Sequence, residues 1–152
     1  MKIELENVLP MDIEKRRFEI ITEELNGRVF LPEQEKIIKR VIHTTADFEY
    51  ADSLCFSEGV ITHVKEAILN GACIVTDTQM AMSGINKKAL AKFGGEVYNF
   101  MSDADIAENA KKNGTTRATA CIDKAASLNK PLIFAIGNAP TALVRLYELI
   151  QD

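Results

Sequence analysis

Histidine is the side chain best suited to exchange a proton near neutral pH, and this sequence contains two histidines, His43 and His63. His43 lies where a helical pattern is expected to end, in the string Ile42-His43-Thr44-Thr45-Ala46-Asp47. Unpaired carbonyl groups at the carboxyl end of a helix favour the imidazolium form, which can donate a proton. The alternative interpretation is a capping histidine that only bonds those carbonyl groups.

Neither a metal site nor a nucleotide site has a signature in the sequence. His63 falls within a helical pattern, where a surface or packing role is favoured, and no His-x-x-x-His or Cys-x-x-Cys element supplies metal ligands. Gly94-Gly95 is too short for a dinucleotide-binding loop, and no Gly-Lys-Ser or Gly-Lys-Thr follows a predicted strand. We therefore expect no structural metal and no nucleotide cofactor.

Arg117 is a candidate for binding a carboxylate group of a ligand. It follows Gly114-Thr115-Thr116 and precedes the small residues Ala118, Thr119 and Ala120. Small residues allow a ligand to approach the backbone closely, and a guanidinium group can make two parallel hydrogen bonds to a carboxylate. A solvated helical arginine is the alternative interpretation.

Two amphipathic helices are expected to place His43. Apolar residues recur at helical spacing from Asp12 to Leu25, and Gly27 follows as a stop signal. Pro32 opens a second helical pattern, which ends close to His43. The candidate proton donor would therefore lie at the carboxyl end of the second helix.

Short apolar segments alternate with helical patterns in the rest of the chain. Strands are predicted at 53–57, 72–77, 96–100 and 132–137, and helices at 60–69, 78–93, 104–128 with Gly114 as a candidate break, and 141–150. This order predicts an α/β fold with a doubly wound parallel sheet between helices. Ligands bind at the carboxyl ends of strands in such sheets, which directs attention to Asp77 and Asn138.

Composition fits one globular domain, residues 1–152, because 47% of the residues are hydrophobic and 26% are charged. A net charge of -4 argues against nucleic acid or an anionic membrane as a partner. No apolar run approaches the roughly 18 to 20 residues that span a bilayer. The three cysteines, Cys55, Cys73 and Cys121, lie in small or apolar surroundings and are predicted to be buried and reduced, which favours a cytoplasmic location.

Five strings along the chain occur together in one known family. They are Ile13-Glu14 with Phe18-Glu19-Ile20-Ile21, Val41-Ile42-His43-Thr44-Thr45-Ala46-Asp47, Ile74-Val75-Thr76-Asp77-Thr78-Gln79-Met80 with Gly84-Ile85, Thr116-Arg117, and Ala135-Ile136-Gly137-Asn138-Ala139-Pro140-Thr141-Ala142-Leu143. Through these strings, over essentially its whole length, the sequence resembles the precorrin isomerase family of cobalamin biosynthesis, the precorrin-8X and cobalt-precorrin-8 methylmutases.

The resemblance implies a flavodoxin-like three-layer fold, a homodimer, and migration of a methyl group between adjacent ring carbons of precorrin-8 or its cobalt form. The product would be hydrogenobyrinic or cobyrinic acid, and no external cofactor is needed. The resemblance makes His43 the catalytic acid that protonates or hydrogen-bonds a ring nitrogen. It places substrate binding on Arg17, Thr44, Asp77, Met80, Gly84, Ile85, Arg117 and Asn138. For Met80, Gly84 and Ile85 a plain core role is the alternative.

Two features depart from the family pattern. Arg17 stands where the family usually has a serine, so a hydroxyl contact to substrate is lost or replaced by a charge. Family members also continue for several tens of residues beyond the last predicted helix, so the family's last strand is expected to be missing here.

Two other functions compete with the isomerase. One is a corrinoid-binding or interaction module that kept the fold without turnover. The other is a receiver-like signalling domain, which would need an acidic cluster and a lysine at the strand ends, and Asp77 alone supports it poorly.

Overall fold

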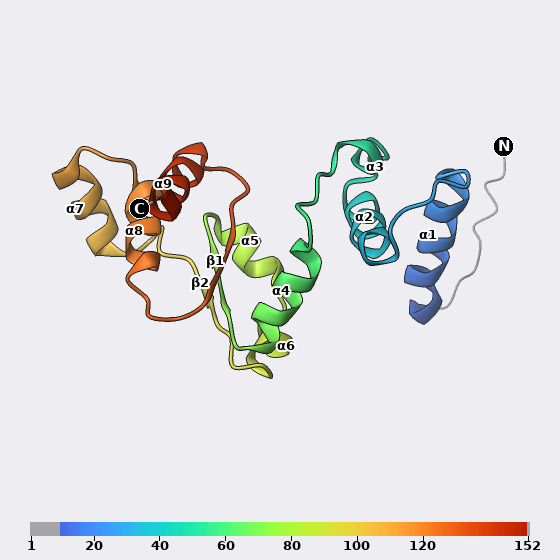
Figure 1. Ribbon diagram of the computed structural model, residues 1–152, viewed down its shortest axis with the longest axis horizontal. Helices are drawn as coiled ribbons and strands as arrows, with labels where there is room; N and C mark the ends of the chain where they lie inside the picture. Colours follow the sequence, from blue (N-terminus) through green and yellow to red (C-terminus); the bar gives the residue numbers. More distant parts are fainter. Residues whose placement is uncertain (1–9, 152) are drawn as a thin grey trace. The chain divides into compact units, whose positions relative to one another are not determined.

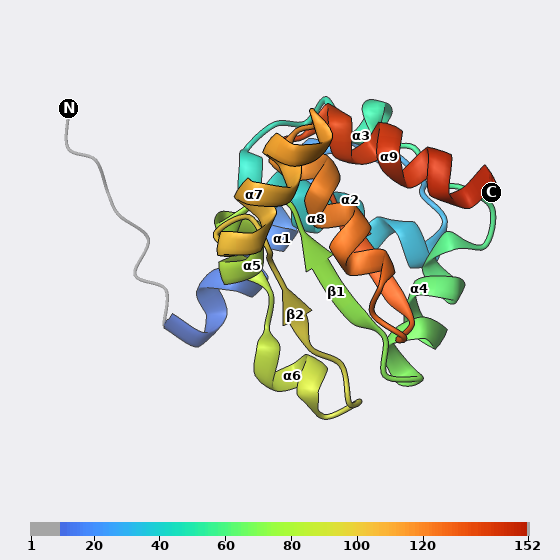
Figure 2. The same ribbon diagram turned by 90° about the vertical axis from the view of Figure 1, so that its left-hand side faces the viewer.

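The computed structural model describes residues 10–151, and the chain forms two compact units that meet in sequence between Ile61 and Thr62 (Figures 1 and 2). The first is called the helical unit and the second the sheet unit. Helix α4 (Val60–Leu69) begins at the end of the helical unit and continues into the sheet unit.

The helical unit contains α1 (Pro10–Glu24), α2 (Pro32–Thr45) and the short α3 (Tyr50–Ser53). Both predicted N-terminal helices are confirmed. Helix α1 packs on α2 through Ile21, Leu25, Ile38 and Ile42, which are all buried. Pro32 begins α2 because its fixed φ suits a first helical position, and Ala46 ends the helix in the left-handed conformation, with φ of 56°.

The strand predicted at 53–57 is wrong. Residue Ser53 ends α3, and the next residues form no strand. Leu54 and Phe56 pack against the core of the helical unit, whereas Cys55 is exposed. The short apolar segment that suggested a strand therefore packs its large side chains against helices. The prediction that all three cysteines are buried also fails at Cys55, while Cys73 and Cys121 are buried as expected.

The sheet unit is built on three parallel strands in the order β2-β1-β3. The strands are β1 (Cys73–Thr76), β2 (Val97–Tyr98) and β3 (Leu132–Ala135), and the remaining helices are α5 (Gln79–Gly84), α6 (Lys87–Ala91), α7 (Ala104–Asn113), α8 (Arg117–Ala126) and α9 (Pro140–Gln151). The predicted α/β class and parallel sheet are confirmed, with shorter strands than the sequence suggested.

Helices cover both faces of this sheet (Figure 1). Helices α7, α8 and α9 lie on one side, and α5 and α6 lie on the other. Val75 of β1 contributes to a core with Ile106 of α7 and Cys121 of α8, and Ala142 of α9 packs with α8 in a second cluster. β1 is the central strand of the sheet. After β1 the chain forms β2 on one side of it, and later forms β3 on the other side.

The predicted helix at 104–128 is divided at the expected residue. Gly114 caps α7 with φ of 64°, a conformation that glycine adopts without a steric penalty, and α8 starts three residues later. The pattern at 78–93 likewise forms two short helices rather than one. Among the described residues, no helix has the length and hydropathy to cross a bilayer.

Candidate functional site

His43 occupies the last turn of α2, as its position in the sequence predicts. Carbonyl groups of α2 near His43 accept from other donors: Thr44 Oγ1 donates to the Arg40 carbonyl at 2.9 Å, Thr45 Oγ1 donates to the Val41 carbonyl at 2.9 Å, and the Ala46 N–H donates to the Ile42 carbonyl at 2.8 Å. Neither imidazole nitrogen has a hydrogen-bond partner within residues 10–151. The capping interpretation of His43 therefore receives no support, and its nitrogens remain available to a ligand.

The imidazole of His43 stacks on the ring of Phe18 from α1. The ring centroids are 5.4 Å apart and the planes differ by 25°. The guanidinium carbon of Arg40 lies 4.9 Å from the centroid of the same Phe18 ring, and Arg40 Nη1 pairs with Glu14 Oε1 at 2.6 Å. Two side chains of α2 thus hold one aromatic ring of α1.

His43 faces a hollow of about 200 Å³ between α1 and α2. The lining side chains are Arg17, Ile20, Ile21, Ile42, His43, Ala46 and Phe48. Most of this surface is apolar, and the exposed guanidinium of Arg17 is its permanent cation. This volume is below the ~300–1,000 Å³ typical of pockets that enclose drug-sized ligands. The hollow is therefore large enough only for the edge of a large ligand.

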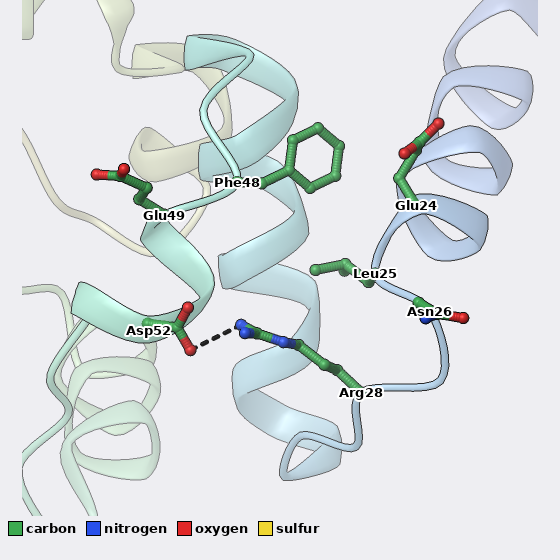
Figure 3. Close-up of a pocket in the computed structure, with 7 residues that line it drawn as sticks. All are labelled: Glu24, Leu25, Asn26, Arg28, Phe48, Glu49 and Asp52. Carbon is green, nitrogen blue, oxygen red and sulfur yellow. Dashed lines mark hydrogen bonds and ion pairs between the residues drawn. The ribbon is translucent and has the colours of Figure 1, made fainter.

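A second hollow of about 440 Å³ shares Phe48 with the first (Figure 3). It is lined by Glu24, Leu25, Asn26, Arg28, Phe48, Glu49 and Asp52. Arg28 Nη1 pairs with Asp52 Oδ1 at 2.7 Å across it. Because the remaining charged groups there, Glu24 and Glu49, are carboxylates, this hollow repels an anionic ligand.

In the sheet unit, Asp77 follows β1 and binds the loop that follows β3. Its carboxylate accepts hydrogen bonds from the backbone N–H groups of Gly137 at 3.1 Å, Asn138 at 2.7 Å and Ala139 at 2.9 Å. Only 8% of Asp77 is exposed. Burial alone would raise the pKa of Asp77, but the three N–H donors outweigh it and lower the pKa below its ordinary value.

Thr76 and Asn99 link the carboxyl ends of β1 and β2. Asn99 Nδ2 donates to the Thr76 carbonyl at 2.9 Å, and Gln79 Nε2 donates to Asn99 Oδ1 at 3.0 Å. The sequence did not single out Asn99. Its place just after the predicted strand at 96–100 was the available signal, because polar groups that follow strands gather at one sheet edge.

The N-termini of α8 and α9 meet at the same edge of the sheet unit. Thr116 caps α8 by accepting from the Thr119 N–H at 3.1 Å, and its hydroxyl lies 2.9 Å from that of Thr141 in the first turn of α9. Arg117 is the first residue of α8 and is exposed. Helix N-termini and a guanidinium group both favour anionic groups, so this edge suits carboxylates.

The predicted site residues fall into two groups. Arg17, Thr44 and His43 lie in the helical unit, where the hydroxyl of Thr44 bonds its own helix. In the sheet unit, Asp77 contacts the Asn138 backbone, and Arg117 lies at the adjoining helix start.

The structure also bears on the alternative core role of three predicted contacts. Met80 is 85% exposed and Gly84 is exposed, so neither is a core residue, while Ile85 is half-buried. Among residues 10–151, no three acidic, histidine or cysteine side chains gather as a metal site would require.

Comparison with known proteins gives a consistent result. A family model described as precorrin-8X methylmutase matches residues 12–152. The cobalt-precorrin-8 methylmutase of Priestia megaterium is 46% identical over 145 residues, which cover 95% of this chain and 64% of that protein. The corresponding protein of Salmonella typhimurium is 45% identical over 145 residues, covering 91% of this chain and 69% of the relative.

A solved structure supports the same comparison at the level of fold. The crystal structure of a precorrin-8X methylmutase from Thermus thermophilus superposes with a TM-score of 0.81 at 36% identity. The match covers 93% of this chain and 68% of that one. This chain therefore spans about two thirds of the length of the proteins it matches.

Proposed function

The chain belongs to the precorrin-8X methylmutase family, and from this premise we propose that it takes part in the methyl shift on precorrin-8 or cobalt-precorrin-8, with His43 as the catalytic acid. The relatives' names give the substrate class. The observation that carries the proposal in this chain is an imidazole with two unengaged nitrogens at an apolar hollow.

The reaction is an isomerisation, so its atoms and electrons balance within the substrate. A methyl group leaves one ring carbon and bonds to the neighbouring one, which requires no oxidant, reductant or external methyl donor. His43 in its imidazolium form lends a proton to a ring nitrogen, draws electron density towards it, and recovers the proton when the product forms. The apolar walls, including Ile20 and Ile42, hold the edge of the flat ring and exclude water.

The carboxylates of the substrate need cationic and N–H partners. In the helical unit Arg17 supplies a cation on the rim of the hollow in place of the family's serine. In the sheet unit, Arg117 and the Asn138 segment offer a carboxylate-binding edge, which Asp77 holds in place through three backbone hydrogen bonds. Met80, Gly84 and Ile85 follow β1 and are proposed as apolar contacts.

The finer architecture and the assembly are also proposals. We propose a doubly wound sheet of the flavodoxin type, which the central position of β1 supports. We propose a homodimer in the cytoplasm, supported by an apolar face on α9 and by three free cysteines.

Turnover and binding separate the isomerase from a corrinoid-binding module. The protein is mixed with precorrin-8 or cobalt-precorrin-8 while the absorbance spectrum is followed, and product affinity is measured in parallel. We expect His43→Ala to lose at least about a hundredfold in kcat, as expected for a general acid, with product affinity retained.

His63→Ala is the matched control because His63 is exposed on α4, and it should keep wild-type turnover. Product binding without turnover in the wild type would identify the binding module. Product that leaves both the spectrum and the thermal midpoint unchanged would exclude the whole family function.

A further inference from the structure

Phe18 lies outside the buried cluster of the helical unit. The buried cluster of Ile21, Leu25, Ile38 and Ile42 has several half-buried neighbours, and Phe18 is not one of them. Its ring stacks on His43 and lies below the guanidinium of Arg40. The ring of Phe18 therefore contacts two side chains of α2 that lie outside that cluster.

Arg40 restrains the ring of Phe18 by occupying the space beside it. Arg40 also forms an ion pair with Glu14, which adds a second contact between α1 and α2 on this side of the ring. Beyond Phe18 lies a hollow of about 380 Å³ lined by Phe18, Glu35, Lys36, Lys39 and Arg40. Without Arg40, the ring could turn into that space.

His43 has no hydrogen bond within residues 10–151 that would fix the plane of its imidazole. A histidine side chain rotates about two bonds, and a proton donor acts efficiently only when its N–H points at the acceptor. Stacking on an aromatic ring removes that freedom without occupying either nitrogen.

We propose that Phe18, held by Arg40, is a positioning residue that fixes the plane of the His43 imidazole and leaves both nitrogens free for the substrate. This inference rests on the proposed function for its catalytic consequence, whereas the stacking itself is a property of the chain. Phe18 does not touch the reacting atoms; it acts through His43.

The two histidines make the test direct, since His43 and His63 are the protein's entire set of imidazole proton signals in an NMR spectrum. A proton above an aromatic ring is shielded by the ring current. In Phe18→Leu the His43 signals should move downfield while those of His63, which is exposed on α4, stay in place. Phe18→Tyr should restore the wild-type positions, and His63→Gln assigns the signals.

Turnover gives the second readout. Phe18→Leu should reduce kcat by roughly tenfold to a hundredfold, the scale expected when a catalytic group loses its orientation. Product affinity should change less than threefold, and Phe18→Tyr should recover most of kcat. Leu25→Val, in the core of the same unit, controls for stability: it should lower the thermal midpoint and leave both the His43 signals and kcat unchanged.

The proposal is overturned if Phe18→Leu leaves the His43 signals where they are, or shifts them without reducing kcat. If the wild type has no turnover but Phe18→Leu still moves the His43 signals downfield, the isomerase function is excluded, while the role of Phe18 in orienting the imidazole is confirmed. The two failures are thus distinguishable.

Discussion

Asp77 illustrates how one residue can organise a candidate site through hydrogen bonds to the protein's own backbone. Its buried carboxylate receives three N–H groups from residues that are 60 to 62 positions away in sequence. These N–H groups precede α9 and would otherwise need water or a ligand. The residue that sequence analysis offered as a substrate contact therefore has most of its hydrogen-bonding capacity engaged by the protein.

Replacing Asp77 should cost stability in a pH-dependent manner. Asp77→Asn removes a charged acceptor of three hydrogen bonds, and we expect a loss of roughly 1.5–3 kcal/mol in unfolding free energy at pH 7. The folded-state pKa is lowered, so the stabilisation is fully present above the unfolded value of about 4 and is lost as the pH falls through the folded value. Urea unfolding at pH 7 and pH 3 measures both effects.

The matched control for that substitution is Asp105→Asn. Asp105 pairs with Lys124 at 2.8 Å, but its side chain is largely exposed, so the loss should be much smaller. An Asp77 variant as stable as wild type at pH 7, or equally destabilised at both pH values, would contradict the role assigned to the carboxylate.

The three thiols should differ sharply in reactivity. Burial raises the pKa of the Cys121 thiol to about 11, and the carboxylate of Asp103 acts in the same direction. Cys73 is 1% exposed, whereas Cys55 is exposed. Because the thiolate is the reactive species, alkylation at pH 8 should modify Cys55 alone in the native protein and all three cysteines in denaturant. Intact-mass measurement shows the number of additions, and rapid native labelling of two or more thiols would count against this packing.

At the scale of the elements, three glycines differ in whether a side chain would meet a neighbouring atom or a positive φ would strain it. A Cβ on Gly95 would lie 2.4 Å from the Ala72 carbonyl oxygen, at the turn into β2. Gly95→Ala should therefore cost about 3 kcal/mol. Gly114→Ala meets no atom within 4 Å but keeps a positive φ, and should cost about 1–2 kcal/mol. Gly84→Ala has neither constraint and should be neutral or slightly stabilising.

The thermal midpoint should be lowest for Gly95→Ala, intermediate for Gly114→Ala and highest for Gly84→Ala. A Gly84→Ala protein that is stable but binds product weakly would support the proposed contact between substrate and this glycine. A Gly95→Ala protein as stable as Gly84→Ala would show that the turn into β2 relaxes easily.

Elements whose bounds depend on local sequence signals were predictable from the sequence, and those that depend on contacts with residues distant in the chain were not. The end of α2 near His43 and the break at Gly114 follow from local signals, which the structure confirms. The segment at 53–57 is short and apolar as a buried strand is, but Leu54 and Phe56 pack against helices, and only the tertiary structure shows this.

The same division applies to the candidate site. The sequence placed His43 at a helix end, yet it gave no sign that Phe18 and His43 would stack or that Asp77 would bind the 137–139 loop. These contacts join segments 25 and about 60 residues apart, and a single sequence contains no local pattern for them.

For the whole molecule, the apolar face of α9 is the feature that the described chain leaves unexplained. Leu143, Val144, Tyr147 and Ile150 are each more than half exposed, and residues 143, 147 and 150 fall on one side of the helix. Contiguous apolar surface of this kind marks an interaction site more often than it marks ordinary solvent-facing surface. It supports the proposed homodimer.

Charge on that face should disrupt the dimer. The double variant Leu143→Lys, Ile150→Lys replaces two apolar side chains by ammonium groups. In a symmetric dimer the same charges of both subunits would enter the contact, and the cost of desolvating them opposes association. We expect light scattering to show a dimer for the wild type and a monomer for the double variant. Val29→Lys is the matched control, since Val29 is 95% exposed in the helical unit, and it should remain dimeric. A double variant that stays dimeric would remove the α9 face from the proposed interface, and a wild type that is monomeric at all concentrations would remove the dimer.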